Sequence, residues 1–281
     1  MSWSKKMNWS IYYNIPHELQ PIYLDRLELK KKEPSKKYLD ELTRTHQIKI
    51  PFENLDATDF LRPISIEPQN LINKILKNKR GGYCFELNGL FFLLLLSLGF
   101  DAWMCPCRQL RHPEPYPVPA THCGILVYCE NKTLFCDVGY GGPAPQESLE
   151  FKIGEQQYID KEIFCFYRSG IVPNDTRSRP QDSGWYTLVR KTDKKYDIEM
   201  PLMQMTPLQY YLSDFHGQNM LRSLGDTAYS VRHVSRNTKY GYIDITGNKL
   251  TINENGIKDI IEFKDSDLKN LLLKYFNIDI A

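Results

Sequence analysis

The sequence predicts an α+β fold, and a change of pattern along the chain is the main reason. Over the first hundred residues the apolar residues recur at helical spacing, whereas from Phe100 onward they alternate with a period of two. The last third mixes short strands with one amphipathic helix. Helices first, strands second and a mixed end give an α+β protein. With 281 residues, the chain can form two or three compact units.

Three helices are expected before residue 100. The first begins after Ser35, a preferred N-cap residue, and carries apolar residues through Thr43. The second begins near Pro68 and ends in basic residues, where the helix dipole favours positive charge. The third follows Cys84, holds a long apolar run and ends at Gly99. This last helix is apolar enough to be buried.

Short strands are expected after residue 100, with a hairpin turn at residues 130–132. Four prolines in residues 111–119 predict a loop, because proline interrupts both helices and sheets. Residues 173–184 form a polar connector, and Asp265 caps a final helix. The expected strands are residues 102–105, 124–129, 134–136, 157–159, 163–167, 185–189, 196–199, 229–234, 240–245 and 249–252.

Composition excludes several functional classes. The net charge is +2, so no strong field favours nucleic acid or an anionic membrane as a partner. Residues 1–7 are basic but lack an apolar core, so they do not form a secretory signal. The longest apolar run, residues 87–100, is shorter than the roughly 20 residues that span a bilayer. A cytoplasmic location is therefore expected.

The chain has seven cysteines without regular spacing, which favours reduced thiols over a disulfide scaffold. A zinc site is an alternative, because several cysteines lie close together with His112. However, Cys105 and Cys107 flank a proline, and zinc sites favour pairs separated by two to four residues. Buried thiols are therefore expected, with a non-enzymatic zinc-binding protein as the least favoured function. The clustered cysteines are Cys105, Cys107, Cys123, Cys129 and Cys136.

Residues 80–88, Arg-Gly-Gly-Tyr-Cys-Phe-Glu-Leu-Asn, contain a candidate nucleophile. Cys84 lies in the first turn of the expected third helix, where unpaired backbone N–H groups favour a thiolate. His122 precedes an alternating stretch, and Asp137 opens Asp-Val-Gly-Tyr-Gly-Gly. A histidine that takes the thiol proton and a carboxylate that orients the imidazole suffice for acyl transfer through a thioester.

These motifs resemble the arylamine N-acetyltransferases, whose signature is Arg-Gly-Gly-x-Cys with Glu and Asn close behind. In that family a histidine on a strand follows, and then an aspartate before a glycine-rich turn. Here His122 lies 38 residues after Cys84, and Asp137 lies 15 residues after His122. Ile-Pro-Phe-Glu-Asn-Leu at 50–55 and Gly-Pro-Ala-Pro at 142–145 match two more family blocks. The specific resemblance covers about residues 10–150 and continues diffusely to the C-terminus.

The resemblance implies an architecture around a cysteine-protease-like Cys-His-Asp core. A helical bundle, residues 1–100, would carry Cys84. An antiparallel β-barrel, residues 101–200, would carry His122 and Asp137, and an α/β lid, residues 201–281, would complete the site. The implied activity is ping-pong transfer of an acetyl group from acetyl-CoA, as co-substrate, to an arylamine or arylhydrazine in xenobiotic metabolism. No metal, nucleic acid or membrane partner is implied.

The resemblance also implies residues that contact the substrates. Phe52, Thr121 and Tyr140 match positions near the acceptor, and an aromatic side chain beside the nucleophile could stack on a flat substrate. The matches on the cofactor side are Val118, Gly141 and Gly142. Arg80 is expected to be structural and to pair with Glu53 or Glu86, so that its loss would unfold the site.

One segment departs from the family pattern. Residues 211–218 replace a Ser/Thr/Pro-rich stretch that helps these enzymes hold coenzyme A. The alternative function is therefore an amide synthase or other acyltransferase that uses the same triad with a longer or carrier-bound acyl thioester. Thiol hydrolase or transglutaminase chemistry shares the nucleophile but lacks the flanking blocks.

Overall fold

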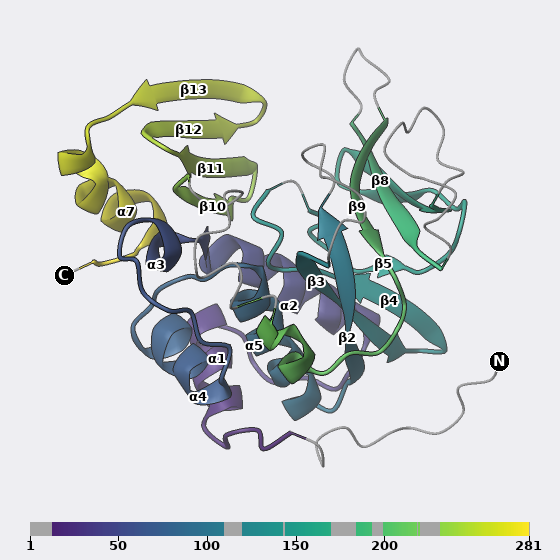
Figure 1. Cartoon of the computed structure of the whole chain (residues 1–281). Coiled ribbons are helices and arrows are strands. Elements are labelled where there is room, and N and C mark those ends of the chain that lie inside the picture. Colours follow the sequence, from purple (N-terminus) through teal and green to yellow (C-terminus); the bar gives the residue numbers. More distant parts are fainter. Residues whose placement is uncertain are drawn as a thin grey trace.

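The computed structural model describes residues 13–109, 120–142, 144–169, 184–192, 199–217, 219 and 231–280. It combines a group of helices with an eight-stranded antiparallel sheet that closes nearly into a barrel and a five-stranded antiparallel sheet near the C-terminus. Figure 1 shows most of the helices in the lower half, the barrel strands on the right, and the smaller sheet with α7 above on the left. The predicted α+β fold is confirmed.

Local sequence signals account for most of the helices. Ser35 Oγ accepts a hydrogen bond of 3.2 Å from the Tyr38 N–H and so caps the first predicted helix. The second starts at Pro68 as predicted but continues as a π-helical turn. The last begins at Leu268 and not directly after Asp265, which lies in a preceding 3-10 turn. The helical elements are α1 (Leu19–Leu27), α2 (Lys36–Lys49), α3 (Leu55–Thr58), α4 (Pro68–Leu71), η2 (Ile72–Lys77), α5 (Cys84–Ser97), η3 (Leu212–Phe215), η5 (Asp265–Asp267) and α7 (Leu268–Phe276).

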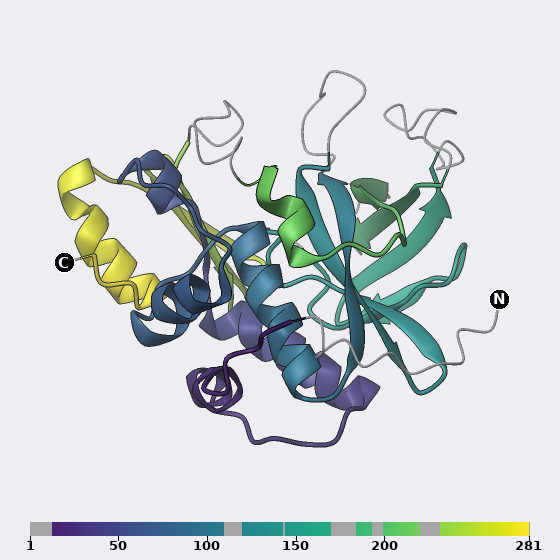
Figure 2. The same cartoon turned by 60° about the horizontal axis from the view of Figure 1, so that its bottom comes forward.

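The central helix is α5. All its residues from Cys84 to Leu96 are buried, as expected for a helix that is apolar on every side. Helix α1 and strands β2 (Asp101–Gln109) and β3 (His122–Cys129) contact it, and Figure 2 shows it beside the barrel strands. Over the described part of the chain, no helix has the length and apolar character needed to cross a bilayer.

The eight-stranded sheet has the order β5-β4-β3-β2-β9-β8-β7-β6. Glu130 and Asn131 both have positive φ, so a tight two-residue turn joins β3 to β4. Between the two edge strands, the Gln157 amide both donates to and accepts from the Glu150 backbone at 2.7 Å, which ties the open edges together. The remaining strands are β4 (Lys132–Cys136), β5 (Leu149–Glu150), β6 (Gln157–Ile159), β7 (Glu162–Arg168), β8 (Tyr186–Thr192) and β9 (Glu199–Met205).

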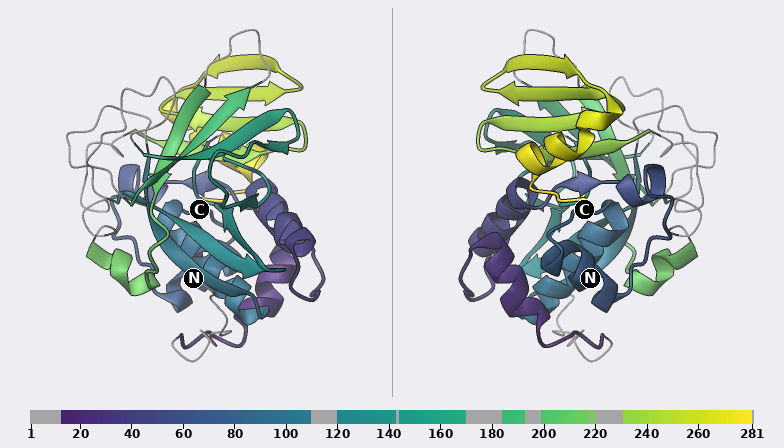
Figure 3. Two further views of the ribbon diagram at one scale, coloured as in Figure 1. Left: turned by 90° about the vertical axis from the view of Figure 1, so that its right-hand side faces the viewer. Right: turned by 90° about the vertical axis from the view of Figure 1, so that its left-hand side faces the viewer.

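The five-stranded sheet has the order β1-β10-β11-β12-β13, and α7 covers the face that is turned away from the barrel (Figures 2 and 3). Its edge strand β1 comes from the N-terminal part of the chain, with Phe52 opposite Ser235. The structure thus ties the segment before the nucleophile to the C-terminal sheet, while the three domain boundaries stay a prediction. The strands are β1 (Phe52–Glu53), β10 (His233–Asn237), β11 (Gly241–Thr246), β12 (Lys249–Glu254) and β13 (Ile257–Glu262).

Candidate active site

Cys84 is the first residue of α5, as predicted, and its side chain is buried. Tyr83 is the N-cap residue, and its backbone N–H donates to Glu86 Oε2 at 3.0 Å. Glu86 therefore accepts a hydrogen bond from a backbone N–H at the N-terminus of α5. The positive end of the helix dipole favours negative charge at this position, which suits a thiolate.

The two glycines before Cys84 are required by close packing and not by a tight turn. Neither Gly81 nor Gly82 has a positive φ. A Cβ on Gly81 would lie 2.1 Å from the Pro51 carbonyl oxygen, and one on Gly82 would lie 2.9 Å from Glu86 Cβ. Since the Gly82 carbonyl accepts from the Glu53 N–H at 2.9 Å, the Ile-Pro-Phe-Glu-Asn-Leu block lies directly against this segment.

His122 and Asp137 lie together beside Cys84. His122 Nε2 is 2.6 Å from Asp137 Oδ2, and both side chains are fully buried. The other ring nitrogen, Nδ1, has no hydrogen-bond partner of good geometry among the described residues. Burial alone would lower the pKa of His122, but the charge and hydrogen bond of Asp137, with Cys84 close by, raise it to about 9. The site thus favours an imidazolium facing Cys84.

Asn88 holds the second oxygen of the Asp137 carboxylate. Its Nδ2 donates to Asp137 Oδ1 at 2.9 Å and to the Cys123 carbonyl at 2.8 Å, and its Oδ1 accepts from the Val138 N–H at 2.9 Å. The Gly139 N–H also donates to Asp137 Oδ1, at 2.8 Å. Asp137 is therefore fixed in one orientation, with Oδ2 left for His122.

The sequence offered two signals for Asn88, its place in the signature around Cys84 and its spacing. It follows Cys84 by four residues and therefore lies on the same face of α5. The partner segment must come very close, since a Cβ on Gly139 would lie 2.9 Å from both Asn88 Nδ2 and Cys84 Cα. Only glycine fits there without a shift of one of these groups.

The six predicted contact residues are placed as follows. Tyr140 is buried and its ring meets that of His122 edge-on, with centroids 5.7 Å apart. It therefore packs on the histidine, although the sequence suggested a place next to the nucleophile. The Thr121 carbonyl oxygen is 3.9 Å from Cys84 Sγ. Val118 lies outside the described residues.

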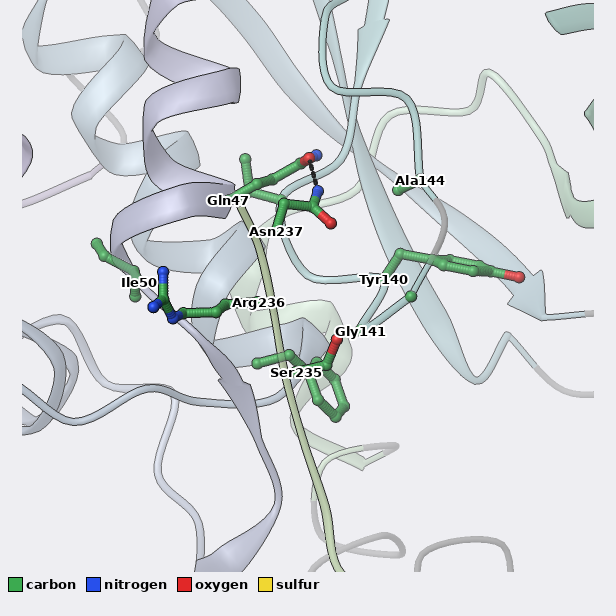
Figure 4. Close-up of a pocket in the computed structure, with 11 residues that line it drawn as sticks. Gln47, Ile50, Tyr140, Gly141, Ala144, Ser235, Arg236 and Asn237 are labelled. Atoms are coloured by element: carbon green, nitrogen blue, oxygen red, sulfur yellow. Dashed lines mark hydrogen bonds between the residues drawn. The ribbon is translucent and has the colours of Figure 1, made fainter. Parts of the chain in front are cut away.

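The remaining three, Phe52, Gly141 and Gly142, line one small cleft between α2, β10 and the segment after Asp137 (Figure 4). Its cavity volume is about 20 Å³, enough for about one water molecule. Gly141 has a φ of 65°, and a Cβ there would lie 2.6 Å from the Phe52 ring. Tyr140 lines the same cleft and its ring contacts that of His122, so the cleft lies beside the candidate triad.

A layer of buried charges lies beneath the start of α5. Arg80 pairs with Glu53 at 2.7 Å and Asp56 at 3.1 Å, which confirms the predicted pairing with Glu53. Glu86 pairs instead with Lys74, at 2.8 Å, and Lys74 also reaches Asp56 at 2.7 Å. Burial raises the pKa of Glu86 to about 7, although Lys74 acts in the opposite direction. No specific sequence signal marks Lys74.

Loss of Arg80 should destabilise the fold. In Arg80→Met the fully buried Glu53 would lose its nearest cation, and breaking a buried pair typically costs about 3–5 kcal/mol. Urea unfolding should show this loss, whereas Lys249→Met, which breaks an exposed pair with Glu262, should leave the free energy of unfolding unchanged. Equal stability of Arg80→Met and wild type would contradict the structural role.

The seven cysteines are all free and buried, as the sequence predicted. Where the structure describes the chain, no group of three or more potential ligands is arranged to hold a metal ion. His112 lies outside the described residues.

The segment that departs from the family pattern packs on the nucleophile helix. The ring centroids of Phe215 and Phe85 are 5.3 Å apart, and a Cβ on Gly89 would lie 2.8 Å from Leu212 Cδ1. The side chains of Leu212 and Phe215, both in η3, are buried. This segment therefore covers α5.

The fold is that of solved arylamine N-acetyltransferases. The enzyme from Salmonella typhimurium superposes with a TM-score of 0.82 and 24% identity, covering 94% of this chain and 92% of that one. The Mycobacterium marinum enzyme in complex with CoA gives 0.80 and 24%, covering 93% of each. Residues 37–281 match the N-acetyltransferase family, and the chain belongs to that family.

A curated relative from Salmonella typhimurium, an arylamine N-acetyltransferase / N-hydroxyarylamine O-acetyltransferase, is 43% identical over 110 residues. The match spans 39% of this chain and 38% of that relative. The chain thus spans well under two thirds of the length of this curated relative.

Proposed function

We propose that the protein transfers an acetyl group from acetyl-CoA to an arylamine or arylhydrazine by a ping-pong mechanism. The observation that carries this proposal is the buried arrangement of Cys84, His122 and Asp137 in a chain of the N-acetyltransferase family. The CoA complex of the Mycobacterium marinum relative supports a coenzyme A thioester as the donor. A cytoplasmic location and a role in xenobiotic metabolism stay predictions.

In the first half-reaction, His122 holds the proton of Cys84 and the thiolate attacks the thioester carbonyl. The carbon–sulfur bond of the donor breaks, a new one forms to Cys84 Sγ, and coenzyme A leaves with the proton from His122. In the second, the amine attacks the acetyl-cysteine, gives a proton to His122 and regenerates the thiolate. Asp137 stabilises the imidazolium whenever His122 carries the proton. No step requires a metal ion.

The substrates would contact residues that surround the triad. Phe52, Tyr140 and Thr121 would contact the flat acceptor, since aromatic rings favour stacking on aromatic amines. Gly141 and Gly142 are proposed for the donor side, where Gly142 presents backbone without a side chain and the missing Cβ of Gly141 makes room for the Phe52 ring. Val118 is proposed for the same donor side.

A panel of donors and acceptors tests the proposal. Under single-turnover conditions, acetyl-CoA should acylate the protein, and an aromatic amine should discharge the adduct much faster than water does. If a carrier-bound or longer acyl thioester acylates the protein while acetyl-CoA does not, the amide synthase alternative replaces the proposal. Discharge by water at the rate seen with amines would indicate a thioester hydrolase.

A further inference from the structure

Gln47, on α2, uses its whole side-chain amide within the protein. Its Nε2 donates to the Asp137 carbonyl at 2.8 Å and to the Pro145 carbonyl at 2.9 Å. Its Oε1 accepts from Asn237 Nδ2 at 2.7 Å, the bond that Figure 4 draws as a dashed line. The side chain is buried, with 7% of its surface exposed. Both N–H donors and the oxygen are therefore engaged.

The two carbonyls lie at the ends of one functional segment, residues 137–145. Asp137 begins it, Tyr140 packs against His122, and Gly141 lines the cleft. Asn88 fixes the Asp137 carboxylate from α5, whereas Gln47 fixes the Asp137 backbone from α2. The position of this carboxylate is thus set from two helices at once.

Asn237 fixes which way the Gln47 amide points. It lies at the end of β10, in the same sheet as β1 and its cleft residue Phe52. Turning the amide over would place Oε1 against the carbonyls of Asp137 and Pro145 and Nε2 against the Asn237 donor, so only one orientation satisfies all three partners. The C-terminal sheet therefore acts on the Asp137 segment through one side chain.

We propose that Gln47 is a positioning residue for Asp137, and that through Asn237 it links the C-terminal sheet to the triad. This inference rests on the proposed function, because it assumes that Asp137 supports His122. Displacement of Asp137 would weaken its bond to His122 and hence the thiolate–imidazolium pair. Cys84 would then need a higher pH to react.

Two substitutions reverse the polarity of the contact from opposite sides. Gln47→Glu replaces the donor that faces two carbonyls with an acceptor, and Asn237→Asp places an acceptor against Gln47 Oε1. Each should slow acetylation of Cys84 by up to about 100-fold, because a misplacement of about 1 Å in a reacting group can cost this much. The pH midpoint of Cys84 alkylation by iodoacetamide should move to higher pH than in the wild type.

The matched control is Gln20→Glu. Gln20 also donates from Nε2 to a backbone carbonyl, that of Ser97, at 2.6 Å. Ser97 is at the opposite end of α5 from Cys84, about 20 Å away at 1.5 Å per residue. Because this variant makes the same chemical change as Gln47→Glu, it should lower the melting temperature. Because the change lies far from Cys84, it should not move the pH midpoint of alkylation.

The outcomes separate this inference from the proposed function. If Gln47→Glu and Asn237→Asp lower only the melting temperature and keep the wild-type pH midpoint, Gln47 is structural and the inference is wrong. If acetyl-CoA fails to acylate the wild type, the proposed function fails, yet alkylation still shows whether Gln47 acts on Cys84. Should Gln47→Glu not fold, Asn237→Asp decides alone.

Discussion

Replacing Cys84 with alanine should abolish acetyl transfer, with a loss of at least about 10³-fold in turnover. The reason is that the acetyl group then has no sulfur beside His122 with which to form a thioester. The intact mass of the wild type should increase by one acetyl group after mixing with acetyl-CoA, and that of Cys84→Ala should not.

Cys129→Ala is the matched control. Cys129 is also a buried free thiol, but it is the last residue of β3, whereas His122 is the first. This variant should form the acetyl adduct as the wild type does. Turnover of an aromatic amine by folded Cys84→Ala would rule out the covalent mechanism.

Asp137→Asn should slow acylation of Cys84 by about 10³–10⁴-fold, the range expected of a triad left with the wrong histidine tautomer. Gly139 N–H and Asn88 Nδ2 both donate to Oδ1, so the oxygen of the new amide would take that place. Its NH₂ group would face His122 Nε2, which would have to accept. The neutral ring would then carry its proton on Nδ1, the nitrogen that remains for Cys84, and could not take the thiol proton.

The same substitution should change the pH dependence. Loss of the carboxylate removes the charge that raises the pKa of His122 to about 9, while burial continues to lower the pKa. His122 would lose its proton at a lower pH, and the Cys84 thiolate would form only at a higher pH. The pH midpoint of Cys84 alkylation should therefore increase in Asp137→Asn.

The control for this experiment is Asp244→Asn, because Asp244 forms another histidine–carboxylate pair, with His233 at 2.7 Å in the C-terminal sheet. It should leave the rate of acylation by acetyl-CoA and the alkylation midpoint unchanged. Circular dichroism would verify that both variants fold. Near-normal acylation in folded Asp137→Asn would remove Asp137 from the triad.

Short-range signals predicted the elements that carry the site. The Ser35 cap, the glycine pair before Cys84 and the apolar run of α5 depend on a few neighbouring residues, and the structure has the corresponding elements. The reason for Gly81 lies far away in the chain, however. It is contact with Pro51, some thirty residues away, and a sequence pattern does not contain that distance.

The strands that the sequence missed or cut short differ in their causes. Strand β1 has two residues and exists through its partner β10, with Phe52 opposite Ser235. Strand β13, Ile257–Glu262, is exposed along its whole length, so no alternation of buried and exposed residues marks it. Strand β2 continues beyond its predicted end through Pro106, whose missing N–H costs at most one ladder bond.

The sequence by itself determined the helix that begins at Cys84 and the order of the candidate triad, because these depend on residue type and spacing. It left the partner of Arg80 open between Glu53 and Glu86, and the tertiary structure selected Glu53. The tertiary structure also decided how Asp137 is held, since Asn88 donates to its carboxylate from α5 and Gln47 donates to its backbone carbonyl from α2. An amide side chain has the same donors and acceptors wherever it stands in a sequence. Its role is set only by the partners that folding brings within hydrogen-bond distance.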